Sequence, residues 1–138
     1  MSLSTYALKK NFSFTAELIP EEDVDSQSRK KHDFIICCKA CQQIITKDEF
    51  SLSVGGHHEH LQTNPYGVTF IFRCFNQVWN CSHIGKPESA HSWFPGFEWT
   101  MVACGGCSTH LGWYFSNLQS EGFWGLISEK LVSHPQAS

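Results

Sequence analysis

The stretch CGGCSTHLGWYF spans residues 104–115 and joins a cysteine pair to a run of largely apolar residues. Cys104 and Cys107 have the C-x-x-C spacing that places two thiolates on one tight turn. A second pair, Cys38 and Cys41 in CKAC, has the same spacing. Because zinc prefers four thiolate or imidazole ligands in a tetrahedron, the two pairs together predict one zinc ion. The alternative is that the pairs are unrelated buried cysteines or redox centres.

Four cysteines would complete the coordination shell, whereas a catalytic zinc keeps one position open for water. The ion is therefore expected to be structural. The histidines of GGHHEH, at 55–60, lie in a glycine-rich stretch without a carboxylate pattern, and a second metal site is not expected there. The remaining cysteines are expected to be small buried hydrophobic residues; they are Cys37, Cys74 and Cys81.

The composition is that of one globular domain: 138 residues, 41% hydrophobic and 17% charged. The formal net charge is −3, so a basic nucleic-acid-binding surface is not expected. No apolar run reaches the roughly 18–20 residues of a membrane span, and the first residues lack a secretory signal. The protein is therefore expected in the cytoplasm, the nucleus or both, as a monomer without nucleic-acid or membrane partners.

Short segments separated by turn residues predict an all-β fold, an antiparallel sandwich or half-open barrel. Expected strands span 34–38, 42–46, 50–54, 67–75, 97–104, 110–115 and 123–127. Residues 55–60, 63–67 and 84–92 are expected to be loops, and 126–132 a closing helical turn.

The expected domain spans residues 34–132. Residues 1–33 form an N-terminal segment that contains a charged stretch at 20–33, typical of a flexible linker. Residues 133–138 form a tail.

Tryptophans gather in and after HSWFPGFEWT, at 91–100. In a small β domain the default location of Trp93, Trp99 and Trp113 is the core. However, Trp93 lies in a loop with Pro95, and the other two lie on the strands that enter and leave the second cysteine pair. Three indoles brought together in this way would form an apolar slot that suits flat rings and cations.

In their order along the chain, CCKAC, NPYG, IGKPESAHSWFPGFEWT, CGGCSTHLGWYF and FWGL resemble the thalidomide-binding (CULT) domain family of cereblon. The resemblance covers about residues 34–132. It implies two antiparallel sheets packed at a steep angle, the β-tent, with zinc pinning one end. It also implies a cage of three tryptophans that binds cyclic imides, such as glutarimide or succinimide, including thalidomide-type drugs and protein C-termini that have cyclised to an imide.

The resemblance also implies roles for individual residues. The backbone carbonyl of His91 would accept the imide N–H, its ring would meet one imide oxygen, and the backbone N–H of Trp93 would meet another. Asn64 and Pro65 would lie near the outer part of the ligand. The ligand-binding residues implied in this way are Trp93, Trp99 and Trp113 as walls, Phe115 as base, and His91, Ser92, Asn64 and Pro65.

Longer members of the family carry a Lon-like domain and a helical segment that docks to a cullin–RING ubiquitin ligase. Neither is visible in these 138 residues. The sequence is therefore expected to be either an excised domain or a free-standing family member. Ubiquitin-ligase partners are expected only if the domain is part of a longer chain, where it would be the substrate-recognition domain of the ligase receptor.

Two other functions remain as alternatives. Zinc-containing methionine sulfoxide reductases have two C-x-x-C pairs, but their nucleophilic cysteine follows the second pair, and here no cysteine follows Cys107. No acid–base pair stands out either, so catalysis is not expected. A reader of methylated lysine would use an aromatic cage with an acidic residue nearby, and Glu98 is the candidate.

Overall fold

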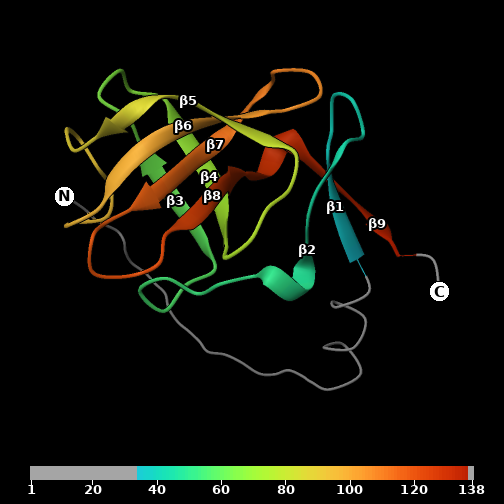
Figure 1. The fold of residues 1–138 in the computed structure, drawn as a ribbon, viewed down its shortest axis with the longest axis horizontal. Helices are drawn as coiled ribbons and strands as arrows, with labels where there is room; N and C mark the ends of the chain where they lie inside the picture. Colours follow the sequence, from blue (N-terminus) through green and yellow to red (C-terminus); the bar gives the residue numbers. More distant parts are fainter. Residues whose placement is uncertain (1–33, 137–138) are drawn as a thin grey trace.

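The computed structural model describes residues 34–136, and the predicted segment 1–33 and residues 137–138 lie outside this range. The described chain is all-β, as predicted, and consists of two antiparallel sheets (Figure 1). The small sheet has the order β2-β1-β9. Its strands are β1 (Phe34–Cys38), β2 (Ile44–Lys47) and β9 (Leu131–Pro135).

The large sheet has the order β3-β4-β8-β7-β6-β5, and all of its neighbouring strands are antiparallel. Two 3-10 turns, η3 and η4, each lead from one strand toward the next. The elements are β3 (Glu59–Thr63), β4 (Thr69–Phe75), β5 (Cys81–Glu88), β6 (Glu98–Cys104), β7 (His110–Ser116), β8 (Phe123–Ile127), η3 (Asp48–Phe50) and η4 (Ser128–Lys130).

The prediction of a strand at 50–54 is wrong. This segment makes only two isolated bridges, Ser51 with Phe75 and Val54 with His57. The chain reverses at Gly55 and Gly56, whose φ angles are 61° and 89°. Glycine adopts such left-handed backbone without a steric penalty, and the tight turn leaves no room for a continuous ladder.

All three expected loops are partly strands, and in the expected loop 63–67 only Thr63, the end of β3, is affected. Residues 59 and 60 of the expected loop 55–60 begin β3, and residues 84–88 of the expected loop 84–92 belong to β5. The sequence did not predict β5 because it contains Pro87, and proline lacks the N–H that a ladder needs. It is tolerated here because β5 is an edge strand whose register is interrupted between Ile84 and Glu88.

The expected helical turn at 126–132 is confirmed in part, because η4 occupies Ser128–Lys130. β9 then follows and pairs with β1 along its whole length, from Cys38 with Leu131 to Phe34 with Pro135. The last strand therefore extends beyond the predicted domain boundary at residue 132.

The large sheet is buried on both faces. One face meets the small sheet in a buried cluster that contains Ile36 and Ile45 of the small sheet with Phe75 and Leu126 of the large one. The opposite face carries an aromatic cluster of Phe72, Cys74, Trp113, Phe115, Phe123 and Ile127. The small sheet thus covers one face and leaves the aromatic face for the site described below.

A β-bulge lets β7 serve both faces. In the β6–β7 ladder, Val102 pairs with Gly112 and the next residue, Ala103, pairs with His110, so Leu111 is the extra residue. Leu111 is fully buried in the cluster beneath the small sheet, whereas Trp113 belongs to the aromatic cluster. The bulge therefore redirects one side chain without breaking the sheet.

Gly125 of β8 leaves space for this aromatic cluster. A Cβ atom at this position would lie 2.7 Å from Cδ2 of Phe72, closer than real Cβ contacts. Gly125→Ala should therefore force the Phe72 ring to move and cost about 1–3 kcal/mol of folding free energy. We expect a clearly lowered melting temperature in near-UV circular dichroism. Ser82→Ala on the exposed edge strand is the control, and an unchanged melting temperature for Gly125→Ala would contradict the packing described here.

Candidate functional site

Two turns bring four cysteines together at one end of the sheets. Cys38 ends β1 and Cys104 ends β6, so each C-x-x-C pair lies where the chain turns back. In the first turn the N–H of Gln42 donates to the carbonyl of Cys38 (2.7 Å), and in the second the N–H of Ser108 donates to the carbonyl of Cys104 (2.9 Å).

The two turns share one backbone conformation. Gln42 and Ser108 each follow the second cysteine of their pair, and both have left-handed φ angles, of 69° and 67°. The two halves of the site are therefore built in the same way.

The four sulfur atoms lie within 4.8 Å of one another. The distance is 3.6 Å between Cys38 Sγ and Cys107 Sγ, and 3.6 Å between Cys41 Sγ and Cys104 Sγ. A tetrahedral ion with metal–sulfur bonds of about 2.3 Å separates its ligands by about 3.8 Å. The predicted four cysteines thus form a site that fits a single metal ion, and a four-sulfur set suits zinc or iron.

The electrostatics of this cluster favour a cation. The Thr109 hydroxyl lies 3.0 Å from Cys107 Sγ and, by donating to it, lowers the pKa of that thiol to about 6. A second thiolate beside it is disfavoured. The hydrogen bond with the Gln43 backbone lowers the pKa of Cys41, but desolvation and the hydrogen bonds with the other three cysteines together raise it to about 12. A bound metal ion would stabilise all four thiolates and so favour their deprotonation.

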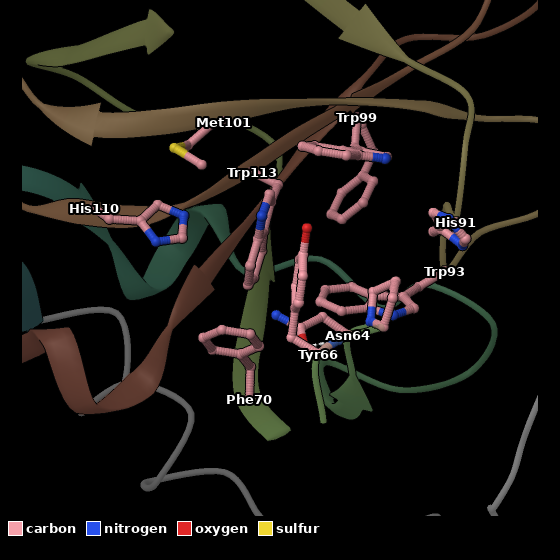
Figure 2. A pocket seen from close by; sticks show the side chains of 11 residues that line it. Asn64, Tyr66, Phe70, His91, Trp93, Trp99, Met101, His110 and Trp113 are labelled. Atoms are coloured by element: carbon pink, nitrogen blue, oxygen red, sulfur yellow. Dashed lines mark hydrogen bonds between the residues drawn. The ribbon is translucent and has the colours of Figure 1, made fainter. Parts of the chain in front are cut away.

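A pocket of about 370 Å³ opens on the aromatic face of the large sheet. The indoles of Trp93 and Trp113 form two of its walls, with ring centroids 4.9 Å apart and planes at 84°. Figure 2 shows these two rings and that of Trp99 facing a common space. The lining residues are Asn64, Pro65, Tyr66, Phe70, His91, Trp93, Trp99, Met101, His110, Trp113 and Phe115.

The loop between β5 and β6 is held by hydrogen bonds from the indole nitrogens of Trp93, within the loop, and Trp99, on β6. Trp93 Nε1 donates to the carbonyl of Thr63 (3.2 Å), and Trp99 Nε1 donates to the carbonyl of Ala90 (2.8 Å). These two hydrogen bonds therefore fix the positions of the Trp93 and Trp99 indoles. Phe72 supports the first wall, because its ring stacks on Trp93 at 5.5 Å and 19°.

His91 has a φ angle of 62°, a left-handed conformation that is uncommon for residues other than glycine. Such strain persists only where the surrounding structure imposes it, and it is frequent at binding sites. Here the residue lies in the loop two positions before Trp93, and its side chain borders the pocket (Figure 2).

Asn64 shapes the lip of the pocket from the other side. Its Oδ1 accepts hydrogen bonds from the backbone N–H of Tyr66 (2.9 Å) and of Val68 (3.0 Å). This side-chain oxygen therefore closes the turn after β3. Tyr66 projects from that turn at the mouth of the pocket and is 91% exposed.

The structure brings most of the predicted site residues together. The three tryptophans, His91, Asn64 and Pro65 line one pocket, and Phe115, only 1% exposed, forms part of its base. Trp113 is also a core residue, with 7% exposure, so the core and the cage share this side chain.

Ser92 does not line the pocket. Its hydroxyl donates to the carbonyl of Phe94 (3.1 Å) and accepts from the N–H of the same residue (3.3 Å), which tightens the loop. A direct contact between Ser92 and a ligand stays a prediction.

Sequence reasoning missed Tyr66, Phe70, Met101 and His110 as lining residues. Met101 pairs with Trp113 across β6 and β7, which only the strand register reveals. Nε2 of His110 donates to the carbonyl of Gly112 (3.1 Å), and burial lowers the pKa of this ring, so its neutral form is favoured. The available signals were the expected strand at 67–75, which contains Phe70, and the motifs NPYG and CGGCSTHLGWYF, which contain Tyr66 and His110.

Comparison with known proteins gives the family. The chain is 40% identical over 104 residues to protein cereblon of Danio rerio and 39% identical over 103 residues to that of Xenopus tropicalis. Each alignment covers 70% of this chain. With protein cereblon of Drosophila melanogaster the identity is 30% over 118 residues. No protein-family model matches the chain.

The chain belongs to the cereblon family. It spans about a quarter of the length of these cereblon relatives, 24% for Danio rerio and 23% for Xenopus tropicalis. The resemblance seen in the sequence is confirmed at the level of the family. Among residues 34–136, no helix is both long enough and apolar enough to cross a membrane.

In this cereblon-family domain, the turn at Asn64 gives a direct test of how the pocket lip is held. Asn64→Ala removes the acceptor for two backbone N–H groups, each of which costs about 1–3 kcal/mol when it is left buried and unpaired and less where water can reach it. We expect faster hydrogen exchange at the amides of Tyr66 and Val68, measured by NMR. Asn64→Asp keeps the acceptor and should retain the protection. Equal exchange in all three proteins would show that the side chain does not hold this turn.

Proposed function

We propose that this domain binds cyclic imides in the tryptophan-lined pocket. The observation that carries the proposal is the arrangement of Trp93, Trp99 and Trp113 around a pocket of about 370 Å³. This volume lies within the roughly 300–1,000 Å³ of typical small-molecule sites. Perpendicular indole walls can enclose a flat five- or six-membered ring on more than one side, as expected for glutarimide and succinimide.

The polar edge of the imide needs fixed partners, because stacking alone does not orient a ring. An imide has one N–H donor and two carbonyl acceptors. We assign the donor to the backbone carbonyl of His91, and the acceptors to the His91 ring and the backbone N–H of Trp93. The left-handed backbone at His91 and the hydroxyl of Ser92 support this assignment, because both restrict the loop that presents these groups.

The lining of the pocket favours a neutral ligand over a cation. None of the described residues that line it is a carboxylate. Glu98, the acid considered for a methyl-lysine cage, is exposed on β6 and is not part of the lining. Since cages for methylated lysine combine aromatic walls with electrostatic attraction, the imide is the better match.

The structure also gives little support to the reductase alternative. Cys74, which lies outside the two C-x-x-C pairs, is fully buried, and burial raises its pKa to about 12. Reactive cysteines are exposed and have lowered pKa values, because the thiolate is the nucleophile. We therefore propose a binding module without catalytic activity.

In the cell, the ligands would be the C-terminal cyclic imides of other proteins, and thalidomide-type drugs would compete for the same pocket. Membership of the cereblon family supports a role as the substrate-recognition domain of a cullin–RING ubiquitin ligase receptor. That role requires ligase-binding parts beyond the quarter of the relatives that this chain spans.

We further propose that the four cysteines hold one structural zinc ion. Cys104→Ser should abolish zinc binding and strongly lower the melting temperature, because the free energy of metal binding is part of the folding free energy. Elemental analysis of the purified protein should give one zinc per chain, and Cys81→Ala, a change outside the ligand set, should leave that ratio unchanged. Folded protein without zinc, or with iron in its place, would refute this proposal.

The imide proposal is tested by titrating tryptophan fluorescence with glutarimide. Trp99→Ala removes one wall and should weaken binding about fivefold or more, since aromatic stacking contributes about 0.5–1.5 kcal/mol beyond area burial. N-methylglutarimide lacks the donor and leaves a buried acceptor unpaired, at a cost of about 1–3 kcal/mol or about 5- to 150-fold in affinity.

Trp79→Phe is the matched control for the titration, because Trp79 packs on Phe50 and does not line the pocket. It should bind glutarimide as the parent protein does. Equal affinity for glutarimide and its N-methyl derivative would rule out the proposed hydrogen bond from the imide N–H to the backbone carbonyl of His91. A collapse of the fold in Trp99→Ala would mean that this side chain is a core residue.

A further inference from the structure

The structure suggests a second site at the end of β4 where its pairing with β8 stops. β4 pairs with β8 from Phe75 with Trp124 to Phe72 with Ile127, and the chain then leaves the sheet as η4. β4 itself continues to Thr69, still paired with β3 on its other side. Residues 69–71 of β4 therefore have no strand paired with them on the β8 side.

The backbone groups on the open side are the N–H of Ile71 and the N–H and C=O of Thr69, because the last pair of the β4–β8 ladder places the Ser128 N–H at the Ile71 carbonyl. Along an antiparallel strand, the N–H and C=O of successive residues point alternately to the two neighbours. The N–H of Cys74 donates to the carbonyl of His58, next to β3, so even-numbered residues of β4 point toward β3. The odd-numbered residues point toward β8, and those of them beyond the end of the β4–β8 ladder present an edge that another strand can pair with.

A groove of about 440 Å³ lies along this edge, lined by Glu59, Thr69, Phe70, Ile71, Ile127, Ser128 and Glu129. The hydroxyl oxygen of Ser128 is buried and has no hydrogen-bond partner among the described residues.

The charge of the groove indicates the kind of partner. Both of its charged residues, Glu59 and Glu129, are exposed carboxylates. Each glutamate has a basic neighbour: Arg73 is the cross-strand partner of Glu59, and Lys130 follows Glu129 in the sequence. Neither forms an ion pair with these glutamates within residues 34–136, and the Arg73 guanidinium lies over the Phe75 ring at 5.8 Å. Among residues 34–136, the two carboxylates therefore have no ion-pair partner.

An apolar surface adjoins the groove. Leu61 and Ile71 are cross-strand partners on β3 and β4, and they are 61% and 46% exposed. A strand that paired with β4 would place every second side chain over such a surface, because side chains alternate along an extended chain.

We propose that this groove binds an extended peptide segment of a partner protein that carries a lysine or arginine. The segment adds a strand to the open edge of β4 and exchanges hydrogen bonds with the backbone of Ile71 and Thr69. Its basic side chain lies between Glu59 and Glu129, and an apolar side chain covers Ile71. The site is separate from the tryptophan pocket, and its function does not depend on imide binding.

The test uses the ¹⁵N-labelled full chain and the peptide acetyl-Thr-Val-Lys-Val-Thr-amide. At saturation, hydrogen exchange at the amides of Thr69 and Ile71 should slow about tenfold or more, as expected for newly paired strand amides. Glu59→Gln combined with Glu129→Gln should weaken binding about three- to tenfold, since exposed ion pairs contribute about 0.2–1 kcal/mol each. Norleucine in place of the peptide lysine should have a similar effect, and Glu121→Gln, which removes an exposed charge elsewhere, should have none.

Peptides methylated at alternate backbone nitrogens, in both phases, separate strand addition from simple charge attraction. One of the two should lose binding, because it can no longer pair with β4 while its charge is unchanged. The proposal is overturned if both methylated peptides bind like the parent. It is equally overturned if the amides of Thr69 and Ile71 stay unprotected, or if the glutamine variants do not discriminate lysine from norleucine.

Discussion

The meeting of four cysteine side chains is the constraint on which the rest of this structure depends. Cys38 and Cys107 are 69 residues apart in sequence, and their sulfur atoms are 3.6 Å apart. Through this contact the end of β1, in the small sheet, is held to the turn between β6 and β7, in the large one. The loop closed in this way includes most of the domain, so the free energy of a metal bound here would add to the folding free energy of both sheets together. The apolar cluster beneath the small sheet then covers one face of the large sheet and leaves the other face for the aromatic residues.

The binding pocket is an extension of the core. Phe72 stacks on Trp93 from behind, Trp113 is nearly fully buried, and Phe115 belongs to both the core and the pocket base. A wall built from core side chains keeps its position without a ligand, so little ordering entropy is lost when a ligand binds. The same arrangement restricts substitutions in the pocket, because few of these aromatic residues can change without affecting the stability of the fold.

The sequence was sufficient to predict the parts that local chemistry determines. The cysteine spacing identified all four members of the cysteine cluster, and short segments between turn residues identified β4, β6, β7 and β8. It failed where the deciding neighbour is distant along the chain. β5 contains Pro87 and is exposed, so only its pairing with β6 makes it a strand. β9 depends in the same way on β1. Met101 became recognisable as a pocket residue only when the β6–β7 register placed it beside Trp113.

The pairing of β1 with β9 also determines how this domain responds to mechanical force. The two strands are antiparallel, and the pair Phe34 and Pro135 lies at the outer end of their ladder. A pull on the chain at both ends would therefore open the ladder one pair at a time, which takes less force than sliding all of its hydrogen bonds at once. This unzipping reaches Cys38 at the last pair, opposite Leu131. A metal bound there would stop it, so the cysteine cluster is also the point at which the domain resists being pulled apart.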